Sequence, residues 1–220
     1  MGRADGPPYR FYGRRRGKRL SPRQERLIDD LLPRLAPDPA RLPAGPVWLE
    51  IGSGGGEHLT AQAADHPEAT LIGCEPFLEG VAKTLGMIED EGLGNVLLLD
   101  DDVRPLLDGL PDSSVDRCFI LFPDPWPKLR HHKRRIVSRE NLDSLARVLK
   151  PSADLRIATD HMDYARWILR HLLAHPDFDW PAERPDDWRL PPAGHRRTRY
   201  EAKALEKGDR PLYFRFTRNT

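Results

Sequence analysis

The chain has 220 residues, with 35 Lys and Arg against 34 Asp and Glu, and a formal net charge of +1. This length suits one domain with a full hydrophobic core. No apolar run is long enough to span a membrane and no signal-peptide segment opens the sequence, so we expect a cytoplasmic protein. Cys74 and Cys118 lie inside apolar runs, which predicts buried free thiols, and the histidines show no zinc-ligand spacing, so we expect no metal.

The first part of the chain divides into a basic tail and a helix. Residues 1–20 are rich in Gly and Arg, and we expect a flexible N-terminal tail there, followed by a single domain over 21–220. Residues 21–24 have the form of a capping box with proline at the first helical position. Apolar residues at helical spacing predict an amphipathic helix that ends before Pro37.

Short apolar runs then alternate with helical patterns along the rest of the chain. The apolar runs cover 47–51, 70–74, 96–99, 115–122 and 154–158, the helical patterns cover 57–65, 77–90, 104–108, 138–149 and 161–173, and 212–216 reads as a final strand. This alternation predicts an α/β fold, with a mostly parallel twisted sheet and helices on both faces. In such sheets ligands bind at the carboxyl ends of the strands.

The first three strands end in residues suited to a nucleotide-like ligand. The first runs into a glycine-rich turn that contains Gly52 and Gly54, which fits a dinucleotide site, an S-adenosylmethionine site or a tight turn alone. The second ends at Glu75, where a carboxylate can accept hydrogen bonds from ribose hydroxyls. The third leads into residues 100–102, all Asp, one of which could accept from an adenine amino group.

The fourth strand leads into the most informative segment, residues 121–135. Asp124 lies between two prolines, which fix φ and pin an acid at a strand end. Trp126 follows, either to stack on a base or to pack beside the prolines. A basic run comes next and indicates a grip on RNA phosphates, with a rigid turn and a solvated charged face as the plainer alternative.

Two further basic clusters lie far from this run in the sequence. One covers residues 10–19 and the other covers residues 196–203. The near-zero net charge therefore hides a strong segregation of sign. If the three clusters converge on one face, that face would bind a polyanion with strong salt dependence.

Taken together and in order, these segments resemble the bacterial tRNA (guanine-N7)-methyltransferases over about residues 45–218. The matching segments are 50–56, Glu75, Asp102, 122–126, Lys128, 134–135, 158–160 and 198–201. The resemblance implies a class I S-adenosylmethionine-dependent methyltransferase with a Rossmann-like fold and an antiparallel final strand. It also implies methylation of N7 of a variable-loop guanine in tRNA. We expect a monomer or a small homo-oligomer.

The resemblance also implies roles for particular residues. The cofactor contacts are Glu50, Gly52, Gly54, Glu75, Asp102 and Asp124, and Asp124 is in addition the catalytic residue. The substrate-binding residues are Lys128, Asp160, Thr198, Arg199, Tyr200 and Glu201, and the expected RNA phosphate contacts are Arg130, Lys133, Arg134 and Arg135. From the residues alone, Asp160 could equally cap the following helix, and Thr198 could simply begin one.

Guanine N7 carries an in-plane lone pair, so attack on a sulfonium methyl group needs no general base. We therefore expect Asp124 to orient the base and stabilise positive charge. Two other functions stay open. One is methylation of an exocyclic amine, although Pro123 and Trp126 depart from the loop used for that chemistry. The other is a non-catalytic RNA-binding domain of the same fold.

Overall fold

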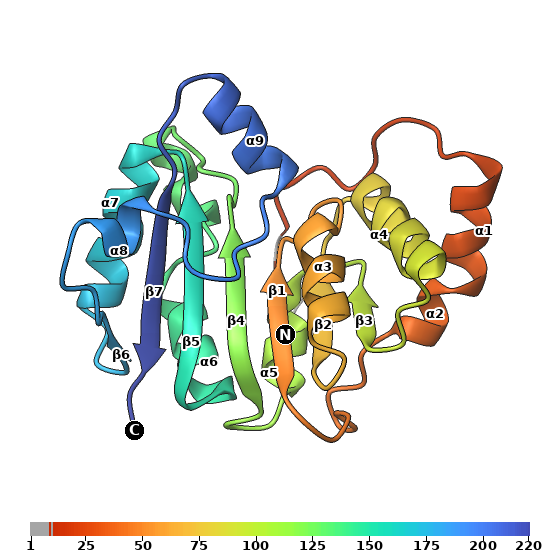
Figure 1. Ribbon diagram of the computed structural model, residues 1–220, viewed down its shortest axis with the longest axis horizontal. Coiled ribbons are helices and arrows are strands. Elements are labelled where there is room, and N and C mark those ends of the chain that lie inside the picture. Colours follow the sequence, from red (N-terminus) through yellow and green to blue (C-terminus); the bar gives the residue numbers. More distant parts are fainter. Residues whose placement is uncertain (1–8, 10) are drawn as a thin grey trace, which may run out of the picture.

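The computed structural model describes residue 9 and residues 11–220, and its centre is a seven-stranded sheet in the order β3-β2-β1-β4-β5-β7-β6 (Figure 1). The strands are β1 (Val47–Ile51), β2 (Thr70–Cys74), β3 (Val96–Leu99), β4 (Val115–Leu121), β5 (Leu149–Thr159), β6 (Phe178–Asp179) and β7 (Leu212–Arg218). Pairings from β3 to β5 are parallel, and β7 is antiparallel to both its neighbours. The predicted mostly parallel sheet with an antiparallel final strand is confirmed.

Helices cover both faces of the sheet. On one face α3 (Glu57–Asp65) and α4 (Leu78–Glu91) pack against residues such as Trp48 and Phe119. On the other face lie α5 (Val103–Gly109), α6 (Arg139–Val148) and α7 (Met162–Leu173), packed against neighbours such as Leu49 and Ile120. Alternate residues of each strand thus enter two separate cores, as strands buried on both faces require. Both cysteines are buried free thiols, as predicted.

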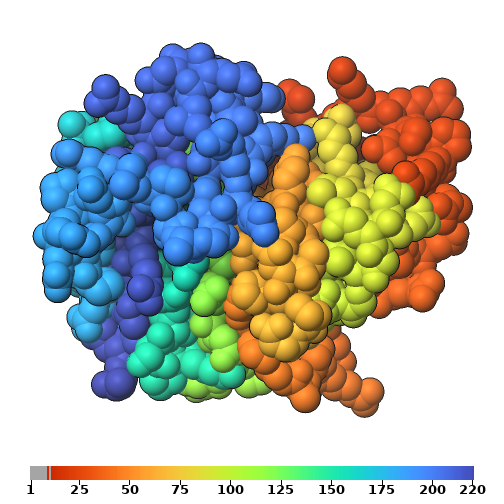
Figure 2. Space-filling view, viewed as in Figure 1, coloured from red at the N-terminus to blue at the C-terminus, as the bar shows by residue number. Residues whose placement is uncertain are grey.

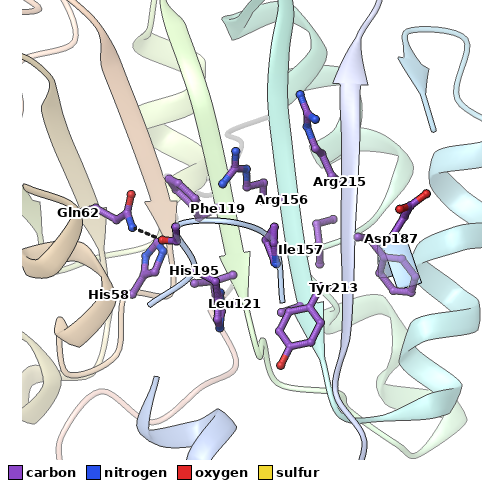
Figure 3. Close-up of a pocket in the computed structure, with 14 residues that line it drawn as sticks. His58, Gln62, Phe119, Leu121, Arg156, Ile157, Asp187, His195, Tyr213 and Arg215 are labelled. Carbon is purple, nitrogen blue, oxygen red and sulfur yellow. Dashed lines mark hydrogen bonds between the residues drawn. The ribbon is translucent and has the colours of Figure 1, made fainter. Parts of the chain in front are cut away.

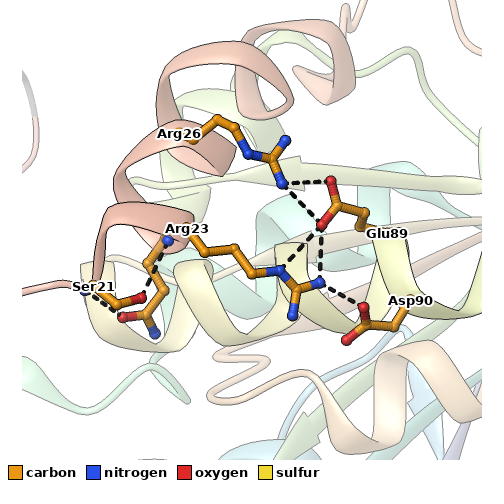
Figure 4. Close-up of polar contacts among 6 residues, drawn as sticks. Ser21, Arg23, Arg26, Glu89 and Asp90 are labelled. Carbon is orange, nitrogen blue, oxygen red and sulfur yellow. Dashed lines mark hydrogen bonds and ion pairs between the residues drawn. The ribbon is translucent and has the colours of Figure 1, made fainter.

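The N-terminal helix is broken in two. The helix α1 (Pro22–Asp30) starts with the predicted capping box between Ser21 and Gln24, and α2 (Leu32–Leu35) follows after a single residue. Pro33 explains the break, because a proline lacks an N–H and its ring clashes with the carbonyl four residues earlier. Figure 4 shows how α1 is fastened to α4, with Arg23 reaching Glu89 and Asp90 and Arg26 reaching Glu89.

The structure differs from the sequence prediction in β5 and in the C-terminal region. The strand β5 begins at Leu149 and passes through Pro151, and its pairing with β4 shifts register between Val115 and Arg117. This irregularity accommodates the proline, which a regular central strand would not. The helices α8 (Asp186–Arg189) and α9 (Arg199–Glu206), the short strand β6 and a 3-10 helix, η1 (Leu129–Arg134), also add to the predicted elements.

The order of strands reverses between β1 and β4, and the turns after these two strands face each other across that point. In open α/β sheets this is where ligands bind. The helix α9 lies over the same end of the sheet, and the segment before it crosses the front of β5 and β4 (Figures 1 and 2). Within the described residues, no helix combines the length and apolar character needed to cross a bilayer.

Candidate active site

A large open cavity lies at the carboxyl ends of the strands, at the point where the strand order reverses. Its volume is about 430 Å³, which lies in the range of pockets that bind small-molecule ligands. Its lining includes Gly52, Gly54, Glu75, Asp101, Asp102, Asp124, Trp126, Lys133, Arg134, Arg135 and Tyr200. The topology thus brings together most of the predicted cofactor residues, with the predicted catalytic acid Asp124 and part of the basic run.

The turn after β1 is shaped for close approach of a ligand. Gly52 and Gly54 have φ of +77° and +61°, a conformation that side chains with a Cβ rarely adopt. A Cβ on Gly54 would lie 3.2 Å from the ring of Tyr200, whereas nothing lies within 4 Å of the same position on Gly52. The turn therefore leaves open space beside its backbone, and this space fits a bound cofactor.

Glu75 follows β2 and is fixed by backbone donors. Its carboxylate accepts hydrogen bonds from the N–H of Gly54 and from the N–H of Phe77, both at 2.8 Å. Burial raises the pKa of Glu75 above its usual range, while these two hydrogen bonds oppose the rise and the nearby Asp124 carboxylate adds to it. The acid is therefore held in one orientation, with its remaining lone pairs available to hydroxyl donors.

Asp102 lies at the end of β3 and caps α5. Its carboxylate accepts from the backbone N–H of Arg104 at 3.0 Å and from the Arg104 side chain at 2.5 Å. Burial alone would raise the pKa of Asp102, but these hydrogen bonds outweigh burial and the pKa is lowered. Asp101 lines the same cavity, so two of the three consecutive acids face the cofactor space.

The catalytic candidate Asp124 sits on a strained turn. Phe122 and Trp126, which bracket the Pro-Asp-Pro segment, have φ of 51° and 42°, an unfavourable region for residues with a Cβ. Asp124 makes no hydrogen bond or ion pair with any residue that the structure describes. Its side chain is exposed to the cavity, yet the surrounding walls strip it of part of its water and raise the pKa of its carboxyl. An unpaired, partly desolvated acid is suited to interact with a ligand.

The basic run after Asp124 is only partly directed at the cavity. Lys133 and Arg134 line it, and the Arg134 guanidinium lies 4.6 Å from the ring centroid of Tyr12 and 4.8 Å from that of Trp126. One face of Trp126 is thus in contact with an arginine. Lys128 and Arg130 are exposed on the adjoining surface and do not line the cavity.

The structure places Arg135 differently from the other residues of the basic run. Its side chain is 0% exposed, although it belongs to the inner wall of the cavity, and it is not part of the exposed basic surface. The guanidinium instead donates to the backbone carbonyl of Pro125 at 2.9 Å and to Asp163 at 2.6 Å. The physical reason is that the backbone becomes extended at Arg135, where η1 ends. Consecutive side chains of an extended chain point in different directions, and the Arg135 side chain points inward.

Part of the N-terminal segment forms a wall of the cavity. Residues 11–14 line it, and the adjoining chain is held to α4 by a hydrogen bond from the N–H of Leu78 to the carbonyl of Arg15. Arg15 also pairs with Asp101. This contribution was not predicted, although the Phe11–Tyr12 aromatic pair among arginines was a usable signal. Residues 1–8 and Arg10, part of the predicted basic tail, lie outside the described residues.

The segment 198–201 begins α9 and packs over the glycine turn. Thr198 caps the helix, Arg199 pairs with Glu57 at 3.7 Å and Tyr200 lines the cavity. Glu201 is buried, where its carboxylate accepts from the Tyr213 hydroxyl at 2.6 Å and contacts His195 Nε2 at 2.5 Å. Asp160 is exposed after β5 and is not among the residues that line the cavity.

The structure does not bring Glu50 to the cavity wall. Glu50 points to the face covered by α3, where its carboxylate lies 2.7 Å from His58 Nδ1 and both side chains are buried. His58 also lines a second, much smaller cavity of about 30 Å³ on that face, together with Gln62, His195 and Arg156 (Figure 3). Gln62 donates to the carbonyl of Gly194 there, which ties α3 to the segment before α9.

The sheet order, the glycine turn and the acids at successive strand ends define the class, which is a Rossmann-like methyltransferase of class I. Residues 44–213 match the family described as "putative methyltransferase". Two solved structures share the fold. An rRNA methylase from Streptococcus thermophilus covers 92% of this chain and 100% of its own at 13% identity with a TM-score of 0.55. A SAM-dependent O-methyltransferase from Thermotoga maritima is 15% identical, with a TM-score of 0.53. The match covers 93% of this chain and 68% of that protein.

Closer relatives are found among curated sequences. The tRNA (guanine-N(7)-)-methyltransferase of Rhodospirillum rubrum is 50% identical over 95% of this chain and 88% of its own length. The enzyme of the same name from Roseobacter denitrificans is 46% identical over 99% of this chain and 100% of its own. This chain belongs to the tRNA (guanine-N(7)-)-methyltransferase family, as the sequence resemblance indicated, and it is an S-adenosylmethionine-dependent enzyme.

Proposed function

We propose that this protein transfers a methyl group from S-adenosylmethionine to N7 of a guanine in the variable loop of tRNA, with Asp124 as the catalytic residue. The observation that carries the proposal is the position of Asp124, unpaired and facing the same cavity as Glu75 and the glycine turn. A carboxylate at that place can act on both the cofactor and an incoming base.

The residues of the cavity fit the cofactor by chemistry and by shape. Glu75 supplies lone pairs for ribose hydroxyls, Asp101 and Asp102 supply acceptors for an adenine amino group, and the turn leaves space for a chain against its backbone at Gly52. S-adenosylmethionine held by these residues would supply an electrophilic methyl group, and its transfer to N7 would leave S-adenosylhomocysteine as the product.

Asp124 acts by orientation and electrostatics. Its carboxylate accepts hydrogen bonds from N1–H and N2–H of guanine, which aims N7 at the donor, and its negative charge stabilises the positive charge that the ring acquires. No proton has to be removed, because the reacting lone pair is already free. Alignment and a fixed charge in a partly desolvated site are sufficient to accelerate such a step.

Recognition of the RNA falls to the residues around the mouth of the cavity. Lys133 and Arg134 line it, and Lys128 and Arg130 extend the basic surface outward. These side chains would contact phosphates and set affinity more than sequence preference. Tyr200 of α9 also lines the cavity, beside Gly54, and its ring could stack on a splayed base.

The proposal is tested by incubating the purified protein with methyl-labelled cofactor and a tRNA transcript, then digesting the RNA and identifying the labelled nucleoside. We expect 7-methylguanosine at a single guanine of the variable loop. A transcript with adenine at that position should take up no label there. Label in an exocyclic amine, or tight binding with no label at all, would contradict the proposal.

A further inference from the structure

The buried side chain of Arg135 connects the turn that carries Asp124 to the start of α7. Its Nε donates to the carbonyl of Pro125, the residue after the catalytic candidate, at 2.9 Å, and its Nη2 donates to Asp163 Oδ2 at 2.6 Å. The guanidinium carbon also lies 4.9 Å and 4.8 Å from the ring centroids of Tyr164 and Trp167. A planar group with several donors, held between rings, is well suited to fix a backbone carbonyl in place.

The turn needs such a support. Prolines at 123, 125 and 127 remove three backbone donors, so the turn cannot be held by a ladder of its own. Phe122 and Trp126 both have positive φ, which a free chain would relax. Within the turn, the carbonyl of Pro125 is the acceptor to which a buried side chain donates. Loss of the guanidinium would therefore free the carbonyl next to Asp124.

Two other roles for Arg135 make different predictions. A phosphate contact would require an accessible guanidinium, but the side chain is fully buried and its strongest partner is already the carboxylate of Asp163. A purely structural role would affect stability alone. Asp163, which is 55% exposed, is the partner that orients the guanidinium without itself facing the cavity.

We propose that Arg135 is a positioning residue for methyl transfer, which holds the Pro125 carbonyl and thereby sets the place of Asp124, with Asp163 orienting its guanidinium. This inference rests on the proposed function. It assigns to catalysis a residue that the sequence pattern groups with the RNA-binding basic run.

The test compares Arg135→Lys, which keeps the charge but loses the forked geometry, with the wild-type protein. We expect kcat to fall about 10–100-fold, since small misplacements of a reacting group have effects of that order. The KM for tRNA and the salt dependence of tRNA binding should not change. Asp163→Asn should lower kcat in the same direction by a smaller factor, because Pro125 keeps its donor.

Two comparison variants separate the competing roles. Lys133→Gln removes the neighbouring cavity-lining cation, and it should weaken tRNA binding and flatten its salt dependence. Arg147→Lys disturbs another partly buried arginine, which donates to the carbonyls of Leu107 and Leu110 remote from the cavity. It should lower the melting temperature and leave kcat of the folded enzyme unchanged.

A wild-type kcat for Arg135→Lys would overturn the inference. A flattened salt dependence would then indicate a phosphate contact, and a lowered melting temperature alone would indicate a purely structural role. If Arg135→Lys does not fold, the exposed variant Asp163→Asn decides, and an unchanged kcat there refutes the inference. Failure of the proposed function is recognised separately, because the wild-type protein would then form no 7-methylguanosine in the same assay.

Discussion

The carboxylate of Glu75 accepts a hydrogen bond from the backbone N–H of Gly54 at 2.8 Å, so the end of β2 and the turn after β1 are fixed to each other. The same carboxylate faces the cofactor space. One acid therefore both shapes the glycine turn and presents the acceptors expected to bind the ribose.

We expect Glu75→Gln to raise the Kd for S-adenosylmethionine about 10–100-fold, because hydrogen bonds to a charged acceptor contribute roughly 1.5–3 kcal/mol. Isothermal titration of the cofactor measures the effect directly. The affinity for tRNA should stay the same. Glu91→Gln, at an exposed position on α4, is the matched control, and an equal loss in both variants would contradict the assignment.

Asp124→Asn should reduce kcat about 10²–10³-fold, which is the usual effect of removing one preorganised electrostatic group. Cofactor binding should be retained, since Glu75 and Asp102 remain in place. Single-turnover methylation of tRNA measures the loss, with Asp179→Asn on the exposed edge strand β6 as the control. Near-normal turnover by Asp124→Asn would show that this carboxylate has no catalytic role.

The pKa of Asp124 leads to a prediction about pH. Burial raises this pKa above the ordinary aspartate value of about 3.9, so protonation of the active carboxylate begins at a higher pH than for an exposed aspartate. The acid limb of the kcat profile should therefore lie above that ordinary value. In Asp124→Asn the residual activity should lack this limb.

The same shift has a consequence for stability. A carboxyl whose pKa is raised in the folded state favours folding when protonated, and this stabilisation is lost as the pH rises through the raised value. Asp124→Asn should therefore be more stable than the wild-type protein at neutral pH. Melting temperatures measured against pH test this, and the difference should shrink as the pH falls. A destabilised variant at neutral pH would count against the desolvated environment.

The exposed and cavity-lining cations should determine the salt dependence of tRNA binding. Arg130→Gln and Lys133→Gln should each lower the slope of log K against log salt by about 0.7–0.9, as expected for one lost phosphate contact. Filter binding across a salt series measures the slope. Arg41→Gln, in the loop at the amino ends of the strands, should leave it unchanged. Equal salt slopes for Arg130→Gln, Lys133→Gln and the control Arg41→Gln would refute a localised set of phosphate contacts.

Sequence reasoning predicted the sheet well because its signals are local. The strands β1, β2 and β3 have the predicted bounds, since each is a short apolar run that ends at a glycine or an acid. The start of β5 was missed because Pro151 normally argues against a strand interior, and the compensating register shift depends on a partner strand. For α9, the sequence indicated only the capping residue, Thr198.

The part of the candidate site that lies at the carboxyl ends of the strands could be predicted from the sequence. Glu75, Asp102 and Asp124 come together because parallel strands deliver their carboxyl ends to one edge of the sheet. The direction of a side chain within an irregular segment is a different matter. Neighbouring Lys133 and Arg135 look alike in the sequence, yet one is exposed and the other fully buried, and only the packing of α7 decides this.

The cavity wall combines residues 11–14 with Tyr200, so its two sides come from opposite ends of the polypeptide. The pocket is therefore complete only after nearly the whole chain has been synthesised and folded. Proteolytic removal of residues 11–14 would open the pocket while leaving the sheet intact, whereas trimming from the other end as far as Tyr200 would also remove β7. Retention of the methyl donor consequently reports on the integrity of the N-terminal segment, which a thermal melt dominated by the sheet would overlook.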